Sequence, residues 1–345
     1  MSLNKVISLE IEIFSKCNRI CNWCPNSIID RKSKNIYMSE KIYLEFLRDI
    51  NKEIHDKENL KLSYSRYNEP FLDIELLKKR VNQARDIIPN IILECNTNGD
   101  VLEKKGEEVL EGLNLDILAI MDYDCKGVEY GKELFNKCGI RTLTNSECKG
   151  YYSDFKDKEH VLLGTHKNIG LIKYHANWPK TALIQGRAGA LIGFGNFENK
   201  EIISNYGGKG EKLKFIKPHT PNTQTGFINP LLGDNRRKEP CSYPTTGIFI
   251  DYNGSVTPCC NIRSDVDMHK DFILGNINED SIKNIFNSKK ATEFRETLKS
   301  KDWKKYPLPC KYCMSRCSFG EKPKTGGENK VKLVQNIRQK NLEKP

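Results

Sequence analysis

The sequence predicts an α/β protein in which parallel strands alternate with helices, followed by a smaller α+β segment. Over residues 1–204, apolar strand-like runs alternate with amphipathic stretches of helical length, a pattern typical of βαβ units. Further along, Asn253 and Gly254 separate two strand-like runs, which indicates a β-hairpin. Cysteines cluster twice, once in each part of the chain.

The composition argues against a membrane protein and against a secreted disulfide scaffold. The chain has 345 residues and a mean hydropathy of −0.60, and no run approaches the ~20 apolar residues of a membrane span. No signal peptide precedes the first strand pattern, so we expect a cytoplasmic protein without a membrane partner. In a reducing compartment, 13 cysteines indicate metal binding or redox chemistry rather than disulfides.

The net charge of +11 is concentrated near the C-terminus. From Lys289 onward the chain has 16 Lys and Arg against 6 Asp and Glu, which accounts for nearly all of the excess. No stacking aromatics are interleaved regularly with these basic residues, so the sequence does not favour nucleic acid as a partner. We expect a solvated basic tail.

The first part of the chain is expected to alternate strands and helices. Ser39 and Asp73 are placed to cap two of the helices. The carboxyl ends of parallel strands meet at one edge of a sheet, so residues just past the predicted strand ends should share one site. Those residues are Cys17, Glu69, Asn96 and Asp122. The predicted strands are 6–14, 60–65, 91–95 and 115–121, and the predicted helices are 39–55, 73–87, 101–112 and 127–137.

Changes in composition predict the domain organisation. A Gly-, Lys- and Pro-rich stretch separates the α/β part from the second cysteine cluster. In the second part we expect a hairpin of strands 247–250 and 255–257 and a helix near 279–298. The predicted segments are an α/β domain at 1–204, a linker or loop at 205–240, a small domain with the second cysteine cluster at 241–320 and a basic polar tail at 321–345.

The first cysteine cluster is a C-x3-C-x2-C motif formed by Cys17, Cys21 and Cys24. It lies on the loop that leaves the first predicted strand. Thiolates are the ligands that iron–sulfur clusters require. Three cysteines instead of four leave one iron without a protein ligand, open to a cofactor or substrate. The alternative is a zinc site completed by a distant residue.

This motif in this position resembles the signature of radical S-adenosylmethionine enzymes. The resemblance implies a partial (β/α)6 TIM-like barrel, a [4Fe–4S] cluster on the three cysteines and S-adenosyl-L-methionine on the open iron. Tyr67, Asn68 and Glu69 stand where the family has a Gly-Gly-Glu motif that binds the methionine amino group. Glu69 matches that motif, whereas the glycines are missing.

Further positions carry the same resemblance. Asn96-Thr97-Asn98-Gly99 resembles the family's turn near the ribose, and Trp23 stands where an aromatic residue lies along the adenine. The resemblance therefore implies Asn96, Asn98 and Trp23 as cofactor contacts. It implies Asp122 and Arg187 as catalytic candidates, the first near the ribose or substrate and the second holding a carboxylate.

The second cysteine cluster resembles the SPASM and twitch domains that follow radical S-adenosylmethionine barrels. The resemblance implies one closed auxiliary [4Fe–4S] cluster and leaves Cys260 and Cys317 as spares, although a full SPASM domain holds two clusters. A structural zinc ribbon is the alternative. The implied ligands are Cys241, Cys259, Cys310 and Cys313.

The resemblance also implies the chemistry. Reductive cleavage of S-adenosylmethionine would yield a 5′-deoxyadenosyl radical that abstracts hydrogen from substrate, with flavodoxin or ferredoxin as a reductant partner. A closed auxiliary cluster favours net oxidation of a small polar metabolite such as an alcohol or sugar, with that cluster accepting the electron. The alternatives are a maturase that cross-links, epimerises or oxidises a ribosomally made peptide substrate, and a Zn- or nucleic-acid-binding protein.

Overall fold

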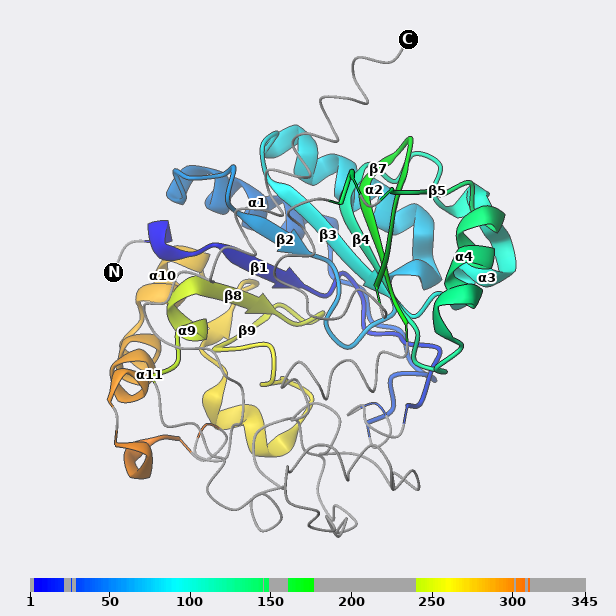
Figure 1. Ribbon diagram of the computed structural model, residues 1–345. Helices are drawn as coiled ribbons and strands as arrows, with labels where there is room; N and C mark the ends of the chain where they lie inside the picture. The colour runs from blue at the N-terminus through cyan, green and yellow to red at the C-terminus, as the bar shows by residue number, and fades with distance from the viewer. Residues whose placement is uncertain are drawn as a thin grey trace, which may run out of the picture.

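One mixed β-sheet of ten strands organises the protein (Figure 1). This computed structural model describes residues 3–21, 26, 29–144, 146–148, 161–176, 240–300, 302–307 and 310. The strands are β1 (Ser8–Ile11), β2 (Lys61–Ser63), β3 (Ile92–Thr97), β4 (Leu115–Met121), β5 (Arg141–Thr142), β6 (Val161–His166), β7 (Ile169–His175), β8 (Gly247–Ile250), β9 (Ser255–Thr257) and β10 (Gly275–Asn276).

The strand order is β10-β9-β8-β1-β2-β3-β4-β7-β6-β5. The inner strands from β8 to β7 all run parallel, and antiparallel strands extend both sides of the sheet. The sheet is open, with no pairing between its two outermost strands. The predicted α/β class with a partial barrel is therefore confirmed.

The helices begin where the sequence provides caps. The side chains of Ser39 and Asp73 accept hydrogen bonds from the first turns of α1 and α2, as predicted. In Figure 1, α10 and α11 lie at one side of the sheet and α3 and α4 at the other. The α-helices are α1 (Glu40–Glu53), α2 (Ile74–Ile87), α3 (Asp100–Lys105), α4 (Gly127–Lys137), α9 (Tyr243–Thr246), α10 (Ile282–Asn287) and α11 (Lys289–Lys299). Short 3-10 turns lie at Leu3–Lys5, Pro70–Asp73, Gly106–Val109, Asp267–Phe272 and Trp303–Lys305.

Two predicted helices are shorter than expected. The helix at 101–112 ends as α3, because Gly106 adopts a φ of 72° and the chain continues as a 3-10 turn. The helix expected near 279–298 is two helices. Ser288 breaks it with an extended backbone and caps α11 by accepting a hydrogen bond from the Ala291 amide.

The C-terminal segment shares its sheet and core with the first part of the chain. Strand β8 pairs in parallel with β1 from Ser8↔Gly247 to Ile11↔Ile250. The hairpin of β8 and β9 is confirmed, with Gly254 at a φ of 83°. One apolar cluster includes Leu9 of β1, Ile250 of β8 and Phe286 of α10. The boundary predicted at residue 241 therefore lies just before a strand of the main sheet.

Part of the predicted organisation lies outside the described residues. This applies to the linker or loop at 205–240, except for Pro240, and to the basic tail at 321–345. Within the ranges that the structure describes, no helix has both the length and the apolar character needed to cross a bilayer.

Close packing of α4 on β7 yields a stability prediction. Gly131 of α4 lies over the buried Tyr174 ring, and a Cβ at this position would lie 2.5 Å from Tyr174 Cδ1. Helix propensity alone favours alanine over glycine by ~1 kcal/mol. Because the ring is held in the core, we expect Gly131→Ala to lower the free energy of unfolding by ~1–3 kcal/mol instead. Urea unfolding measures this change.

The matched control is Glu133→Ala on the exposed face of the same helix. It should change the free energy of unfolding by no more than ~0.5 kcal/mol. A Gly131→Ala variant more stable than wild type would show that α4 does not pack on Tyr174 as described.

Candidate functional site

The first cysteine loop rises from the carboxyl end of β1 and returns beside it. Phe14 and Tyr37 form a β-bridge, and the Ser15 amide donates to the Ile36 carbonyl at 3.0 Å. The loop between these pairs carries Cys17 and Cys21, both partly exposed. It therefore presents thiols above the carboxyl edge of the sheet.

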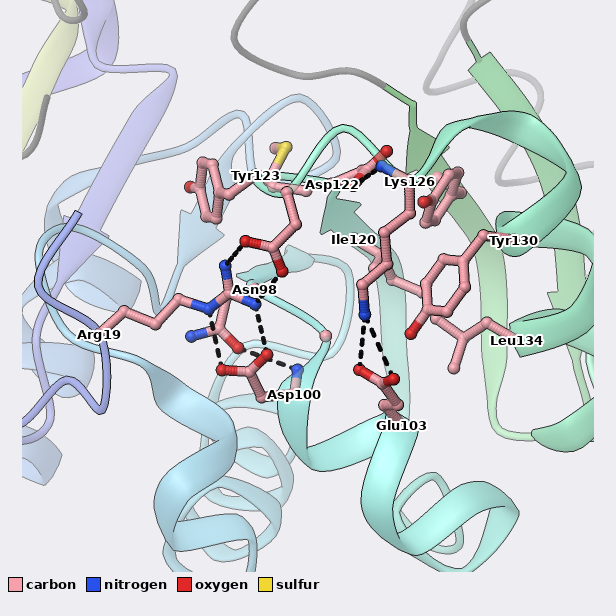
Figure 2. A pocket seen from close by; sticks show the side chains of 14 residues that line it. Arg19, Asn98, Asp100, Glu103, Ile120, Asp122, Tyr123, Lys126, Tyr130 and Leu134 are labelled. Carbon is pink, nitrogen blue, oxygen red and sulfur yellow. Dashed lines mark hydrogen bonds and ion pairs between the residues drawn. The ribbon is translucent and has the colours of Figure 1, made fainter. Parts of the chain in front are cut away.

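Arg19, between the two described cysteines, anchors this loop to the neighbouring strand ends (Figure 2). Its Nε donates to Asp100 Oδ2 at 2.8 Å, and its Nη2 donates to Asp124 Oδ2 at 2.8 Å. Asn18 Nδ2 donates to the same oxygen of Asp100 at 2.6 Å. The hydrogen bonding of the Arg19 guanidinium to the Asp100 carboxylate is the main reason that the pKa of Arg19 is raised. The anchor fixes the cysteine loop on the turns that follow β3 and β4.

Glu69 is a buried carboxylate at the point where the segments that follow the strand ends meet. Its Oε1 accepts hydrogen bonds from the Phe71 amide at 3.1 Å and the Thr97 hydroxyl at 2.7 Å, and its Oε2 accepts one from the Asn98 amide at 2.8 Å. Burial outweighs these hydrogen bonds and raises the pKa of Glu69 to about 7. Among the described residues, no Lys, Arg or His side chain forms an ion pair with this carboxylate.

The structure brings three predicted strand-end segments together. The Glu69 amide donates to the carbonyl of Lys16, the residue before Cys17, at 2.9 Å. Asn98 Nδ2 donates to Asn18 Oδ1 at 2.8 Å. The cysteine loop, the Glu69 segment and the turn after β3 are thus bonded directly to one another. Asn96 lies on β3, with its backbone amide bonded to the Ser65 hydroxyl at 2.6 Å.

Tyr67 and Asn68 lie between this convergence and the C-terminal segment. The Tyr67 hydroxyl donates to the Cys260 carbonyl at 2.9 Å. The Asn68 side chain accepts from the Arg66 amide, while its buried Nδ2 has no hydrogen-bond partner among the described residues. An unsatisfied buried donor of this kind suits a polar ligand atom nearby.

A cleft lies beside the anchor, lined by the turns after β3 and β4 and by α4 (Figure 2). Asp122 lies at its edge, immediately after β4. Both of its carboxylate oxygens accept backbone hydrogen bonds at 2.9 Å, from the Lys126 and Gly127 amides. Asp122 therefore shapes the turn into α4 as well as lining the cleft.

The described cysteines of the second cluster lie in two neighbouring groups of apolar side chains. Cys241 and Cys310 pack with Leu298 and Tyr306. Cys259 packs with Phe249 and Ile262, and Cys260 lies against the same group. Tyr243 contacts both groups. The fold thus brings three predicted ligands that are far apart in sequence, Cys241, Cys259 and Cys310, into adjoining parts of one segment.

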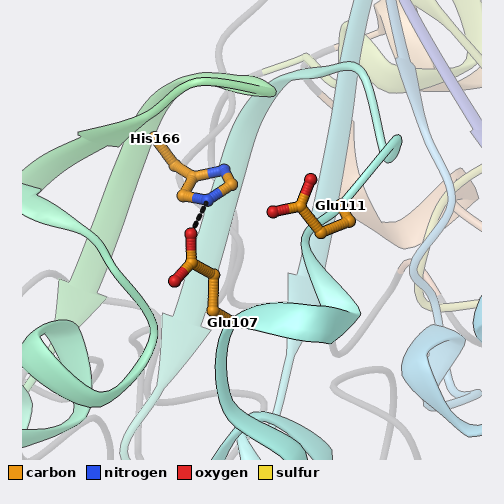
Figure 3. Close-up of side chains that lie close together, drawn as sticks. All are labelled: Glu107, Glu111 and His166. Carbon is orange, nitrogen blue, oxygen red and sulfur yellow. Dashed lines mark hydrogen bonds and ion pairs between the residues drawn. The ribbon is translucent and has the colours of Figure 1, made fainter.

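A separate group of possible metal ligands lies at the opposite end of the sheet (Figure 3). His166 Nε2 lies 3.5 Å from Glu107 Oε1, and Glu111 lies close by. The Lys167 ammonium pairs with Glu111 at 2.6 Å, so that carboxylate already has a cation. This group is at the amino end of β7, away from the cysteine loop.

Several predicted site residues lie outside the described residues, and their placement remains a prediction. They are Trp23, Cys24, Arg187 and Cys313.

Sequence reasoning missed the residues that hold the site together. Arg19, Thr97 and Asp100 adjoin predicted residues, and their positions beside Cys17 and Asn98 were a usable signal. The buried pair of Glu12 and Arg31 gave little signal, because it depends on how the loop returns to the strand.

The chain is similar to several known proteins. Residues 241–317 match the SPASM family, described as an iron–sulfur cluster-binding domain. The chain is 23% identical over 314 residues to the S-adenosyl-L-methionine-dependent 2-deoxy-scyllo-inosamine dehydrogenase of Niallia circulans. The aligned region covers 90% of this chain and 94% of the relative. It is 25% identical over 203 residues to an uncharacterized protein of Methanocaldococcus jannaschii, covering 57% of this chain and 61% of that protein.

A solved structure shares the fold. The crystal structure of BtrN in complex with AdoMet and 2-DOIA matches with a TM-score of 0.55 and 19% sequence identity. The match covers 92% of this chain and 96% of that chain.

Proposed function

We propose that the chain is a radical S-adenosylmethionine enzyme with a C-terminal SPASM-type cluster domain, and that it oxidises a small polar metabolite at an alcohol or sugar-like carbon. The observation that carries this proposal is the hydrogen bond from the Tyr67 hydroxyl to the Cys260 carbonyl. It joins the segment of Glu69 to the residue that follows Cys259, one of the proposed auxiliary ligands. An electron acceptor beside the site of hydrogen abstraction suits a net oxidation.

The donor set at the first loop fits an open iron–sulfur cluster. Cys17, Cys21 and Cys24 would hold it, leaving one iron for S-adenosylmethionine. When bound, the cluster and S-adenosylmethionine together supply a carbon-centred oxidant that removes a hydrogen atom from substrate. The rest of the chemistry falls to the chain, which must orient the substrate and exclude water.

Glu69 fits the ammonium group of S-adenosylmethionine. Its carboxylate is buried, it accepts three hydrogen bonds from neutral donors, and burial has raised its pKa. A cation at this position would favour the ionised form of the carboxylate and would balance its negative charge. The unsatisfied Asn68 Nδ2 nearby is suited to a carbonyl or carboxylate oxygen of the ligand.

Other residues around the site have proposed roles that follow from their positions. Asn96 and Asn98 would contact the ribose and Trp23 the adenine. Asp122 would offer a polar contact at the cleft, although its two oxygens already accept backbone hydrogen bonds. Arg187 would hold a carboxylate.

The auxiliary cysteines would hold one closed cluster through Cys241, Cys259, Cys310 and Cys313. A closed cluster has no iron free for substrate, so we propose that it accepts the second electron of the oxidation.

The first candidate substrates are compounds that resemble 2-deoxy-scyllo-inosamine, for which the Niallia circulans relative is named. An anaerobic assay with aminocyclitols and polyols tests the proposal, and the product should be lighter by two hydrogens. Turnover of a peptide instead would favour a maturase.

Replacing Cys17, Cys21 and Cys24 by alanine should abolish S-adenosylmethionine cleavage. The three thiolates are the proposed protein ligands of the open cluster, so no residual turnover is expected. Chromatography of 5′-deoxyadenosine in anaerobic, reduced protein measures this. Cys125→Ala, at an exposed cysteine outside both clusters, should keep wild-type cleavage. Formation of 5′-deoxyadenosine by the triple variant would place the site elsewhere.

The affinity for S-adenosylmethionine should rise with pH as Glu69 ionises. The pKa of Glu69 is about 7 in the free protein, and pairing with an ammonium lowers it. Binding therefore releases a proton below about pH 7, and affinity increases as pH rises towards that value and then levels off. Anaerobic calorimetry in buffers of different ionisation enthalpy detects the proton.

Glu69→Gln is the corresponding test variant. It should bind S-adenosylmethionine ~10–150-fold more weakly above pH 7, since a charge-assisted bond of ~1.5–3 kcal/mol is lost. Its affinity should no longer follow the pH profile of the wild type. Glu75→Gln, at an exposed carboxylate on α2, is the control and should behave as wild type. An unchanged profile in Glu69→Gln would remove Glu69 from the site.

Removing the auxiliary cluster should uncouple the reaction. We expect Cys310→Ala with Cys313→Ala to form 5′-deoxyadenosine without oxidised substrate, because the substrate radical lacks its acceptor. Circular dichroism establishes that the variant is folded, and mass spectrometry counts both products. Full yield of oxidised product from a folded variant without this cluster would refute the acceptor role.

A further inference from the structure

Charged side chains gather in the interior where the Glu69 segment meets the C-terminal segment. Burying a charge is costly unless it is paired, so this cluster, which we call the buried ion network, must be satisfied internally. Three cations face three anions, and the set is formally neutral. Its members are Glu12, Arg31, Arg66, Asp251, Arg263 and Asp265, of which the least buried, Asp265, has a side chain 12% exposed.

Arg66 reaches from the Glu69 segment into the auxiliary segment. Its Nη2 lies 3.2 Å from Asp251 Oδ1 and donates to the Ile262 carbonyl at 2.9 Å. Both terminal nitrogens lie 3.3 Å from the Thr257 hydroxyl oxygen. Every one of these partners lies within ten residues of Cys259. The guanidinium is therefore fixed by the chain that carries auxiliary cysteines.

Arg263 reaches in the opposite direction. It donates two hydrogen bonds to Asp265, both at 2.8 Å, and its guanidinium lies 4.1 Å above the centre of the Tyr67 ring. Arg31 Nε donates to Asp265 Oδ2, which also accepts one of the bonds from Arg263, at 2.7 Å. Burial opposes ionisation of Asp265, but Arg263 and Arg31 outweigh it and hold the pKa of Asp265 well below its usual range.

Tyr67, two residues before Glu69, is held from several sides by this network. Its amide donates to Glu12 Oε1 at 2.9 Å, and its carbonyl accepts from Asn26 Nδ2 at 2.7 Å. Its ring lies under Arg263, and its hydroxyl bonds to the Cys260 carbonyl. A displacement of the chain near Cys260 must therefore move the Glu69 segment as well.

We propose that Arg66 and Arg263 are positioning residues that couple the auxiliary cysteine segment to the S-adenosylmethionine site, so that order in residues 257–265 sets the affinity for S-adenosylmethionine. This inference rests on the proposed function, because it assigns Glu69 to that cofactor. Through this network, residues 257–265 help to hold the S-adenosylmethionine site in place, in addition to the proposed role of the auxiliary cluster as electron acceptor. Coupling between two sites is reciprocal, so bound S-adenosylmethionine must also order the segment around Cys260.

Hydrogen exchange of the holoenzyme tests the reciprocal effect. Adding S-adenosylmethionine to anaerobic wild-type protein should slow amide exchange in peptides covering residues 257–265, as well as in the cysteine loop. Arg263→Lys keeps the charge but loses the paired bonds to Asp265 and the planar stacking on Tyr67. In that variant the slowing at 257–265 should disappear, and the Kd for S-adenosylmethionine should rise about 10-fold, or ~1.4 kcal/mol.

Arg295→Lys is the matched control. Arg295 is equally buried in the C-terminal segment, stacks on Phe286 at 4.4 Å and donates to the Phe286 carbonyl, but none of these contacts reaches the Glu69 segment. It should leave both the Kd and the exchange response unchanged. If Arg295→Lys weakened binding as much as Arg263→Lys, general destabilisation would explain the result and the proposal would fail.

The remaining outcomes separate this inference from the proposed function. Wild-type protein that binds S-adenosylmethionine with protection of the cysteine loop, but with no change at residues 257–265, would overturn the coupling and leave the proposed function intact. Wild-type holoenzyme that does not bind S-adenosylmethionine would overturn both.

Discussion

The pairing of Glu12 with Arg31 holds the site together. Glu12 has no exposed surface and follows β1 directly. It accepts hydrogen bonds from Arg31 and from the Tyr67 amide, and the Arg31 carbonyl in turn accepts from the Cys17 amide at 2.9 Å. One carboxylate thus joins the cysteine loop to the Glu69 segment. Without it, Arg31 would be a buried charge with only Asp265 to balance it.

The sheet explains why two cysteine clusters from distant parts of the chain share one framework. Parallel strands place the loop after β1, the segment after β2 and the turn after β3 at one edge. Because β8 pairs with the free side of β1, the chain that follows it emerges at the same edge. Asp251 and the residues around Cys259 are therefore delivered beside Arg66 and Tyr67.

The sequence was a good guide wherever local chemistry decides the structure. The caps at Ser39 and Asp73 and the hairpin at Asn253-Gly254 depend on neighbouring residues, and all three were predicted. The shared site expected for Cys17, Glu69, Asn96 and Asp122 was predicted from the parallel topology. The break at Ser288 was missed because the apolar pattern continues across it, although its extended backbone ends α10 and its hydroxyl caps α11.

The buried ion network could not be predicted in this way. Glu12, Arg66 and Arg263 lie in strand-end or loop stretches where charges are usually solvated. Contacts that hold Arg31, Arg66 and Arg263 join residues some 190 to 240 positions apart. Such long-range complementarity leaves no periodic signal in one sequence. The same reason explains why Arg19 was not recognised, since its two partners lie on turns after different strands.

The metal content of anaerobically purified protein tests the central claim most directly. The account requires an open cluster on the first cysteine loop and a closed one in the C-terminal segment. Two four-iron clusters predict roughly eight irons and eight sulfides per chain. Roughly twelve irons would add a second auxiliary cluster and give Cys260 and Cys317 a role as ligands. Zinc in excess of iron, with little sulfide, would contradict the account.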